Sequence, residues 1–589
     1  MKKWILHTKK ADFYSIGQKF GISPVIARII RNRDITGEEE INNFLNGNPD
    51  NLYSPWLMKD METAVDIILK KIEAGKTIRI IGDYDIDGVC STYILYEGLR
   101  ALGAKADWCI PERVRDGYGL NERLVLEAYE DNIDTIVTCD NGIAAKEQIK
   151  LATDKGMTVV VTDHHDIPFE ENNGVRNYIL PEAHAIVNPK QADCHYPFDG
   201  VCGAVVAWKL ITALFEKCDR KNEAMKFLEF AAIATVGDVM DLRDENRIIV
   251  KFGLKALTNT THLGLRALIS ANELDDTPLM AHHIGFRLGP CLNASGRLDT
   301  AKRAVNLLLS STKEEADKAA WDLKEFNENR KELTADWTAK AFEMIDNTEL
   351  KNNKVLLVLL PECHESIAGI IAGRIREKYY KPVLVFTNSE DGLKASGRSI
   401  ESYNMFEELS KCRELFTKFG GHPLAAGLSM PAENFEILNR KLNENTTLTE
   451  DDLKEKLYID VPMPIDYITE ELIMQLSVIE PLGKGNEKPV FAEQHLNILS
   501  MRYIGQNKNM LKMKVSNGKC ALDALLFNDA DTFVSFITEE FGQMEVNNAF
   551  NARNNNIDIA LAYYPSVNEF RGEKNLQITI TDYCRIKNM

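Results

Sequence analysis

The sequence has neither the cysteine spacing of a zinc knuckle nor an apolar run of membrane-spanning length. Its eleven cysteines are scattered with no C-x-x-C pair, which predicts reduced thiols and a cytoplasmic location. Charged residues interrupt every candidate apolar segment, and residues 1–7 are followed by more lysines rather than by the apolar core of a signal peptide. We find no repeats and no low-complexity tract. We therefore expect a protein without a membrane partner.

The size and charge of the chain set further bounds. With 589 residues, of which 44% are hydrophobic and 27% charged, the composition is that of a globular protein with two to four domains. The net charge of −18 argues against non-specific binding to nucleic acid. That sum includes any carboxylates that bind metal, and it does not describe local cationic patches.

The pattern along the chain predicts five segments. Short helices are expected in residues 1–45, and strands alternating with helices, as in a parallel sheet, in residues 46–300. A long connecting helix is expected at 301–346, with Leu323, Phe326, Leu333 and Trp337 on its apolar face. A second α/β domain follows at 347–452, and short β-like runs at 453–589 suggest a small OB-like barrel. The expected strands are 77–81, 106–110, 135–139, 157–162, 355–360, 383–386, 496–504, 510–515, 521–527, 557–563 and 576–581, and a helix is expected at 367–379.

Three aspartates stand close together directly after the first strand of the parallel sheet. Asp83, Asp85 and Asp87 alternate along the chain, so in extended backbone their carboxylates would project to one side. Three like charges so close are unfavourable unless a cation neutralises them. An EF-hand calcium loop is excluded, because its twelfth position is Ile94 instead of Glu and the preceding segment is strand-like.

Other acidic and imidazole side chains follow further expected elements. Asp140 and the run Asp163, His164, His165 come directly after strands, and Asp238 follows an apolar helix pattern. Parallel strands bring such groups to one crevice. The number of these ligands is larger than the four that one tetrahedral zinc ion binds. It suits a pair of Mn²⁺ or Mg²⁺ ions, which promote in-line phosphoryl displacement. Singly, each Asp could be only a helix cap and the two His a surface pair, but together they favour a functional site.

These motifs resemble, in order and spacing, the four motifs of the DHH phosphoesterases. They are residues 82–88, 139–142 and 163–165, together with Asp238. The chain is similar in particular to the RecJ family of single-strand-specific DNA exonucleases, through residues 113–120, 289–297, 420–427 and 481–491. The match runs from about residue 50 to the C-terminus. It implies a DHH catalytic domain at 46–300, a DHH-associated substrate-binding domain at 347–452 and an OB-fold-like nucleic-acid-binding domain at 453–589.

The resemblance also implies roles for the metal-site residues. Asp85 and Asp140 would hold one ion, and Asp140 would bridge to a second ion. The ligands of this second ion would be Asp87, Asp140, His164 and Asp238. His165 would lie near the phosphate, and Asp163 would orient the imidazoles. Ile81 stands where some relatives have a His, so Asp83 or water would complete the first ion's ligands.

Substrate contacts are implied for a separate set of residues. They are Arg113, Asn293, Arg297, Ser396, Arg398, Gly421 and His422. The two arginines Arg297 and Arg398 could form bidentate phosphate contacts, and Gly420 with Gly421 would let backbone N–H groups approach a phosphate. Each arginine could equally form a structural salt bridge, and the glycines a tight turn. In the last domain, Tyr503, Lys508, Lys512 and Lys514 are either a base-stacking platform or a plain solvated face.

The expected function is that of a 5′-to-3′ exonuclease that degrades single-stranded DNA to nucleoside 5′-monophosphates, in DNA repair and recombination. The resemblance implies a monomer that works beside a helicase and a single-strand-binding protein. Two alternatives stay open. One is a phosphodiesterase for short oligonucleotides or cyclic dinucleotides, against which the residues after 453 count. The other is a non-catalytic DNA-binding relative, against which the intact acidic positions count.

Overall fold

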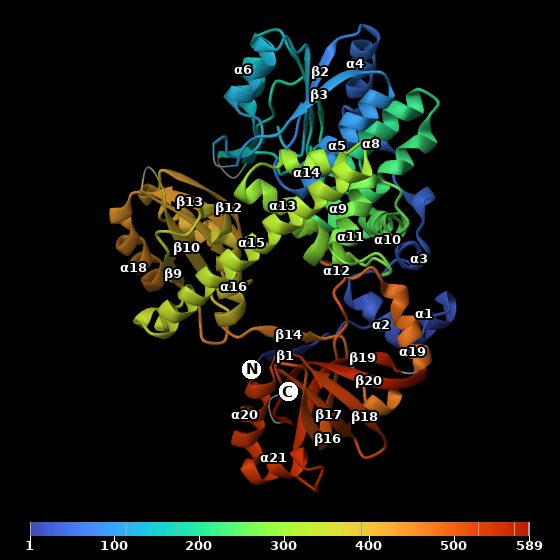
Figure 1. Cartoon of the computed structure of the whole chain (residues 1–589), viewed down its shortest axis with the longest axis vertical. Helices are drawn as coiled ribbons and strands as arrows, with labels where there is room; N and C mark the ends of the chain where they lie inside the picture. Colours follow the sequence, from blue (N-terminus) through green and yellow to red (C-terminus); the bar gives the residue numbers. More distant parts are fainter. Residues whose placement is uncertain are drawn as a thin grey trace. The chain divides into compact units, whose positions relative to one another are not determined.

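The computed structural model describes residues 2–113, 115–172, 175–389, 392–527, 529–570 and 572–586 (Figure 1). It divides into two compact units. Unit 1 comprises residues 1–46, 447–480 and 486–589, and unit 2 comprises residues 47–446 and 481–485. Among the described residues, no helix is both long enough and apolar enough to cross a membrane.

Unit 2 is built on a five-stranded parallel sheet, as the sequence predicts. The order is β3 (Lys105–Cys109), β2 (Thr77–Ile81), β4 (Thr135–Cys139), β5 (Thr158–Thr162) and β8 (Ala185–Val187). β2 and β4 have the expected bounds, while the strand expected at 106–110 is shifted by one residue at both ends and the strand expected at 157–162 begins one residue later. The short strand β8 and the hairpin of β6 (Phe169–Asn172) and β7 (Val175–Tyr178) were not foreseen.

Helices cover both faces of this sheet. Ile78 and Ile80 belong to a core shared with α4 (Met61–Glu73), α5 (Ile86–Ala101) and α8 (Gly203–Lys217). Ile81 and Ile136 belong to a second core, shared with α6 (Glu122–Glu130) and α7 (Lys146–Asp154). Burial on both faces explains why the central strands β4 and β5 carry apolar or Thr side chains without alternation, whereas the edge strand β3 is only half-buried and contains Lys105 and Asp107.

The part of unit 2 that contains the parallel sheet continues as helices. They are α9 (Leu228–Gly237), α10 (Asp244–Thr258), α11 (Leu263–Ala271), α12 (Ala281–His283), a π-helical turn η4 (Ile284–Leu288), α13 (Gly289–Leu298) and α14 (Lys302–Leu308). The elements α12, η4 and α13 follow one another without a break, so residues 281–298 form one helical run.

The expected helix at 301–346 is two helices, α14 and the long α15 (Lys313–Asp346). The chain breaks between them because Thr312 caps α15 and forms a capping box with Glu315. The expected apolar face was partly wrong, since Leu323 is buried but Leu333 is 42% exposed. Small residues dominate the buried face, which suits close packing against α11, α13 and α16 (Glu365–Tyr379).

A second sheet completes unit 2. Its order is β12 (Lys418–His422), β13 (Ala425–Met430), β11 (Gly392–Arg398), β10 (Val383–Ser389) and β9 (Leu356–Leu359). Only β9 and β10 run parallel. Apolar residues of α16 pack against both β9–β10 and the last turns of α15. This confirms the second α/β domain.

Unit 1 contains a closed five-stranded barrel. The strands run in the order β16 (Phe491–Ile504), β17 (Met510–Ser516), β18 (Ala521–Leu526), β20 (Glu573–Cys584) and β19 (Asp558–Phe570), and β19 pairs back with β16. Helices α20 (Ala530–Phe541) and α21 (Gln543–Phe550) connect β18 to β19, and β18 and β20 are parallel. The expected OB-fold is confirmed.

The first residues of the chain fold onto this barrel domain. Strand β1 (Lys3–Leu6) pairs in parallel with β14 (Lys456–Ile459), and the Trp4 indole donates to Asp582 Oδ2 at 2.7 Å. Three helices follow, α1 (Phe13–Phe20), α2 (Pro24–Asn32) and α3 (Glu38–Asn46). A buried ion pair joins Arg33 to Asp460 at 2.7 Å.

Candidate metal centre

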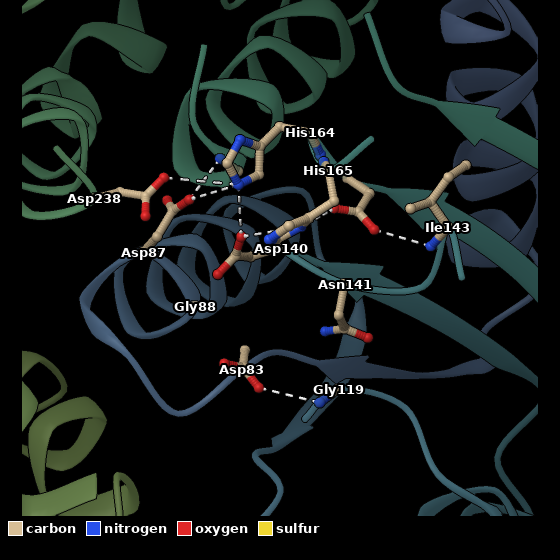
Figure 2. A network of polar contacts seen from close by, with 12 residues as sticks. Asp83, Asp87, Gly88, Gly119, Asp140, Asn141, Ile143, His164, His165 and Asp238 are labelled. Atoms are coloured by element: carbon tan, nitrogen blue, oxygen red, sulfur yellow. Dashed lines mark hydrogen bonds and ion pairs between the residues drawn. The ribbon is translucent and has the colours of Figure 1, made fainter. Parts of the chain in front are cut away.

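The acidic motifs meet at the carboxyl edge of the parallel sheet (Figure 2). Asp83 and Asp85 lie in the loop after β2, and Asp140 and Asp163 directly follow β4 and β5. Asp238 follows α9, which packs against α5. Residues separated by more than 150 positions therefore share one site, as the parallel topology predicts.

Three groups of ligand atoms can be distinguished, and the one formed by Asp140, His164 and His165 overlaps the other two. Asp87, His164 and Asp238 form one of these two, with His164 Nε2 lying 3.5 Å from Asp87 Oδ2 and 3.8 Å from Asp238 Oδ2. Asp83, Asp85 and Asp140 form the other, and their oxygen atoms lie within 4.8 Å of one another. Asp140 Oδ1 is also 3.1 Å from His164 Nε2, so this carboxylate lies between the two groups (Figure 2).

Two helix N-termini hold the carboxylates of Asp85 and Asp87, which follow β2. Asp85 caps α5 and accepts hydrogen bonds from the backbone N–H groups of Asp87 and Gly88. Asp87 in turn accepts from Gly203 and Ala204 at the start of α8, both at 2.7 Å. A methyl group on Gly203 would lie 2.7 Å from Asp140 Cβ, so only glycine lets α8 approach this closely.

The loop after β4 aims Asp140 by an unusual backbone turn. Asp140 has a positive φ of 60°, which Asp tolerates better than most residues. The next side chain, Asn141, donates to the carbonyls of Ile81 and Cys139 and accepts from Leu120 N–H. These bonds tie the ends of β2 and β4 together beneath the site.

Asp163 lies at the site but its oxygens are already engaged. It accepts hydrogen bonds from His165 Nδ1 at 2.7 Å, from Ile143 N–H at 2.9 Å and from His164 N–H at 2.7 Å. The Tyr118 hydroxyl donates to the Asp140 carbonyl at 2.6 Å and lies 3.1 Å from His165 Nε2. This tyrosine contact was not foreseen, although its motif had been noted, because no local pattern indicates which hydroxyl reaches the site.

The cluster contains more carboxylates than cations, and the pKa values of its carboxyl groups reflect this excess of negative charge. Burial, and then neighbouring carboxylates, raise the pKa of Asp83, Asp85 and Asp140, and raise the pKa of Asp238 to about 8. Asp163 differs, because the hydrogen bond from His165 outweighs its burial and lowers its pKa.

The two histidines shift in opposite directions. Burial lowers the pKa of His164. Burial would also lower the pKa of His165, but the hydrogen bond to Asp163 outweighs it and raises the pKa to about 9. His164 therefore has the neutral form that binds metal, and His165 the cationic form that binds anions.

The residues fit hard divalent cations. Asp83 Oδ2 and Asp140 Oδ1 are buried and have no hydrogen-bond partner. Unsatisfied buried carboxylate oxygens are rare in proteins unless an ion completes them. A set of carboxylates with one imidazole suits Mn²⁺ or Mg²⁺.

An arginine cluster lies within the same unit. Arg297 Nη1 donates to the Ser366 carbonyl at 2.9 Å, and the Arg113 guanidinium lies over the Tyr84 ring at 4.9 Å. Among the described residues, no carboxylate forms an ion pair with Arg113, Arg297 or Arg398. Burial, followed by Arg113 and other arginines, lowers the pKa of Arg297 to about 10. The cluster thus holds positive charge that an anion would stabilise.

The other expected substrate residues take varied positions. Asn293 Oδ1 accepts from Ile86 N–H at 2.8 Å and so supports the metal loop. Ser396 lies on β11, and Gly421 on the edge strand β12, where a methyl group would meet the Ala425 carbonyl at 2.6 Å. His422 is exposed and lowers the pKa of Asp166, next to His165, after the larger effect of Lys190.

In unit 1, part of the expected stacking platform has structural partners. The Tyr503 ring stacks on Phe550 at 5.5 Å, and its hydroxyl donates to Asp531. Lys512 forms an ion pair with Asp523 at 2.7 Å. These contacts give both side chains partners within unit 1, which neither the stacking platform nor the solvated face had included.

Family models match three parts of the chain. They are the DHH family N-terminal domain at residues 77–235, the DHHA1 domain at 352–447 and the RecJ OB domain at 459–582. Each match falls on one of the three folded parts described above.

Whole-chain comparisons agree with the family models. The single-stranded-DNA-specific exonuclease RecJ of Escherichia coli is 32% identical, with 95% of each chain covered. RecJ of Bacillus subtilis is 36% identical over 88% of this chain, which spans 64% of that protein's length. RecJ of Thermus thermophilus in complex with Mn²⁺ shares the fold, with 24% identity, a TM-score of 0.81, and 99% of this chain and 79% of that chain covered. A further solved structure, an exonuclease RecJ bound to manganese, is 30% identical, with a TM-score of 0.58, and covers 69% of this chain and 98% of its own. The chain therefore belongs to the RecJ family of DHH phosphoesterases.

Proposed function

We propose that this chain is a 5′-to-3′ exonuclease specific for single-stranded DNA, which releases nucleoside 5′-monophosphates in DNA repair and recombination. One observation carries the proposal. A buried carboxylate cluster and a set of arginines for which the described residues offer no carboxylate partner lie in the same unit. A cleaved phosphodiester needs both, metal ions at the scissile phosphate and cations at a neighbouring phosphate. The names of the relatives support the single-stranded substrate.

We assign two divalent ions, Mn²⁺ or Mg²⁺, to the carboxylate cluster. Asp83, Asp85 and Asp140 would hold one ion. The second would be held by Asp87, Asp140, His164 and Asp238. When bound, such a pair stabilises the attacking and leaving oxygens of an in-line displacement. The manganese in the solved RecJ structure at 30% identity supports this assignment.

Asp163 and His165 would position the phosphate. Asp163 accepts a hydrogen bond from the protonated Nδ1 of His165, which fixes the ring and favours its cationic form. The Tyr118 hydroxyl restrains the other ring nitrogen. We assign to His165 the contact with an oxygen of the scissile phosphate, and to Asp163 the orienting role.

The arginines would bind the 5′-terminal phosphate. Attack of water on phosphorus breaks the bond to the 3′ oxygen, so each cycle leaves a new 5′-phosphate on the shortened strand. Arg113, Arg297 and Arg398 would bind this group after every step. Contacts from Asn293, Ser396, Gly421 and His422 would complete the strand's path.

We further propose a monomer that acts in the cytoplasm beside a helicase and a single-strand-binding protein. The cysteines support the compartment, because all eleven are free thiols. The OB-fold of unit 1 supports a substrate longer than a dinucleotide.

The direct test is digestion of a long single strand labelled at its 5′ or its 3′ end, with Mn²⁺. We expect mononucleotides to be released first from the 5′-labelled strand, and no digestion of a blunt duplex. Asp140→Asn is the matched control, since Asn tolerates the positive φ of this position but removes the shared charge. It should abolish hydrolysis while DNA binding persists.

Four results would contradict the proposal or one of its assignments. Release of label from the 3′ end would reverse the polarity. Hydrolysis of dinucleotides alone would favour the short-substrate phosphodiesterase. Tight binding of DNA without any hydrolysis would favour the non-catalytic alternative. Near-normal activity of Asp140→Asn would overturn the assignment of Asp140 as the bridging ligand.

A further inference from the structure

One aromatic side chain close to the metal centre is left in solvent. Phe286 is 79% exposed, more than any other large apolar side chain among the described residues. It lies in the π-helical turn of the helical run 281–298. A ring so exposed contributes little to the core, and its placement calls for another explanation.

The π-helical turn is dictated by the residue four positions further on. Pro290 has no N–H group, so the Phe286 carbonyl cannot receive the usual helical hydrogen bond. In the same turn, the Gly289 N–H bonds to the Ile284 carbonyl, five residues back rather than four, which widens the turn. Such turns within α-helices are frequent at functional sites.

The helical run lies along the metal loop, which is the loop after β2 that carries Asp83 and Asp85. One face of the run contains positions 285, 289, 293 and 296. Each of these residues lies against either the metal loop or the end of α9. A methyl group on Gly285 would lie 3.9 Å from Val236, and one on Gly289 would lie 3.1 Å from Ile86. Near the other end, a methyl group on Gly296 would lie 2.5 Å from the Tyr84 carbonyl. The N-terminal end of the run therefore lies beside Val236, two residues before Asp238, and its C-terminal end lies beside Tyr84.

This orientation places Phe286 and Arg297 at opposite ends of the metal loop. They are eleven positions apart in the sequence, which is about 16 Å along a helix axis. At the B-DNA spacing of 3.4 Å per phosphate on one strand, that distance is about five nucleotides, and fewer when the strand is extended. With the 5′-phosphate at Arg297, Phe286 would face the strand a few nucleotides downstream.

The surroundings of Phe286 suit a nucleic acid strand. Arg287 is adjacent and donates to the Asn272 carbonyl at 3.0 Å, without a carboxylate partner among the described residues. The rings of His282 and His283 lie close together at 4.0 Å. Val239, directly after Asp238, is 59% exposed and has a positive φ of 56°, which is strained for a β-branched residue. An exposed ring next to a cation, here Arg287, is the arrangement that binds single strands by stacking.

We propose that Phe286 is a stacking platform for a nucleobase of the single strand, on the downstream side of the scissile phosphate. The inference rests on the proposed function and extends it, because it gives the direction in which the strand leaves the metal centre. The exposed ring thus becomes a specificity element, since a base can stack on it only when it is unpaired.

Kinetics with strands of different length provide the first test. Phe286→Ala should raise KM for a 5′-phosphorylated 20-mer about 5- to 150-fold, the range measured for loss of one stacked base. A 5′-phosphorylated dinucleotide is too short to reach the ring, and its kinetics should not change. Phe286→Trp should restore the KM for the 20-mer, whereas Phe286→Leu should not.

The matched control is Tyr129→Ala. Tyr129 is 49% exposed and ends α6 just before β4 begins, at the edge of the sheet opposite the metal centre. This variant should behave as wild type on both substrates. Equal kinetics of Phe286→Ala and wild type on the 20-mer would overturn the inference.

A binding experiment separates this inference from the proposed function. 5-Iododeoxyuridine is placed in turn at positions 1 to 8 of a phosphorothioate strand, which resists hydrolysis, and cross-linked by light. We expect Phe286 to be the cross-linked residue at one position downstream of the first, and the product to be lost in Phe286→Ala. Cross-linking elsewhere only, or none, would overturn the inference. If the protein proved not to be a nuclease, the proposed function would fail while this map still tested the platform.

Discussion

At the scale of residues, the site separates into carboxylates that lack partners and carboxylates that have them. Asp140 and Asp238 have raised pKa values and few hydrogen bonds, whereas Asp163 has a lowered pKa and a full set of donors. The sequence could nominate all three, because each follows a strand or helix. It could not distinguish their roles, which depend on backbone N–H groups and ring nitrogens brought in by other segments.

A buried acid outside the metal centre gives a prediction about stability. Glu229 on α9 accepts a hydrogen bond from Thr260, and burial raises its pKa from 4.5 to about 7. The folded state therefore prefers the neutral acid. Its destabilising effect is absent below pH 4.5, grows as the pH rises through 7, and reaches about 3 kcal/mol. Glu229→Gln should thus raise the free energy of unfolding at pH 8 and leave it nearly unchanged at pH 4.5.

Urea denaturation of the wild type and Glu229→Gln at the two pH values measures this difference. Glu62→Gln on the exposed side of α4 is the control and should show no pH-dependent difference. The same stability change for Glu229→Gln at both pH values would contradict the assignment of burial as the cause.

At the scale of elements, the strands of the parallel sheet were predictable because their burial leaves a local signal. β2 and β4 have the predicted bounds, and β4 is buried throughout, while β2 carries one charged side chain, Arg79, which pairs with Asp107 and Asp131. Helix ends depended on single capping contacts, as at Thr312, where a long predicted helix divides into α14 and α15. Strand β8 was missed because three residues carry too little pattern.

The approach of β11 to the end of α13 gives the second prediction. Arg398 on β11 lies close enough to Arg297 on α13 to contribute, after burial, Arg113 and Arg330, to the lowered pKa of Arg297, and neither Arg297 nor Arg398 has a carboxylate partner in the described chain. Replacing Arg398 by Gln should cost about 1.5–3 kcal/mol, or roughly 10- to 150-fold in kcat/KM, on a 5′-phosphorylated strand. A strand with a 5′-hydroxyl group should show little of this loss, because it lacks the terminal phosphate.

The comparison of the two strands with one variant is the measurement. Arg374→Gln serves as control, since Arg374 is exposed and pairs with Glu377 on the same helix. An equal loss on both strands would mean that Arg398 has a structural role or binds an internal phosphate.

At the scale of the whole molecule, chain order and folded units differ. The sequence pattern places the first 45 residues before the catalytic domain, yet they fold with the last domain in unit 1. Lys3 pairs with Lys456 and Arg33 with Asp460, across more than 400 positions. No local periodicity encodes such pairing. The burial of the Arg33 charge implies that it has a partner, but this burial cannot be read from one sequence.

The last prediction follows from that ion pair. Arg33 donates to Asp460 at 2.7 Å and to the Glu487 carbonyl at 2.7 Å, and both charged side chains are buried. Arg33→Ala should leave the Asp460 charge uncompensated and destabilise unit 1 by about 3–5 kcal/mol. Hydrogen exchange should quicken in β1, β14 and β16, whereas the strands of the parallel sheet and Mn²⁺ affinity should not change.

Lys3→Ala, which breaks an exposed pair with Asp451, should have an effect below about 1 kcal/mol. The double variant Arg33→Met with Asp460→Leu should recover much of the loss, because apolar side chains can replace a buried ion pair. Faster exchange throughout both units would show instead that the two unfold as one.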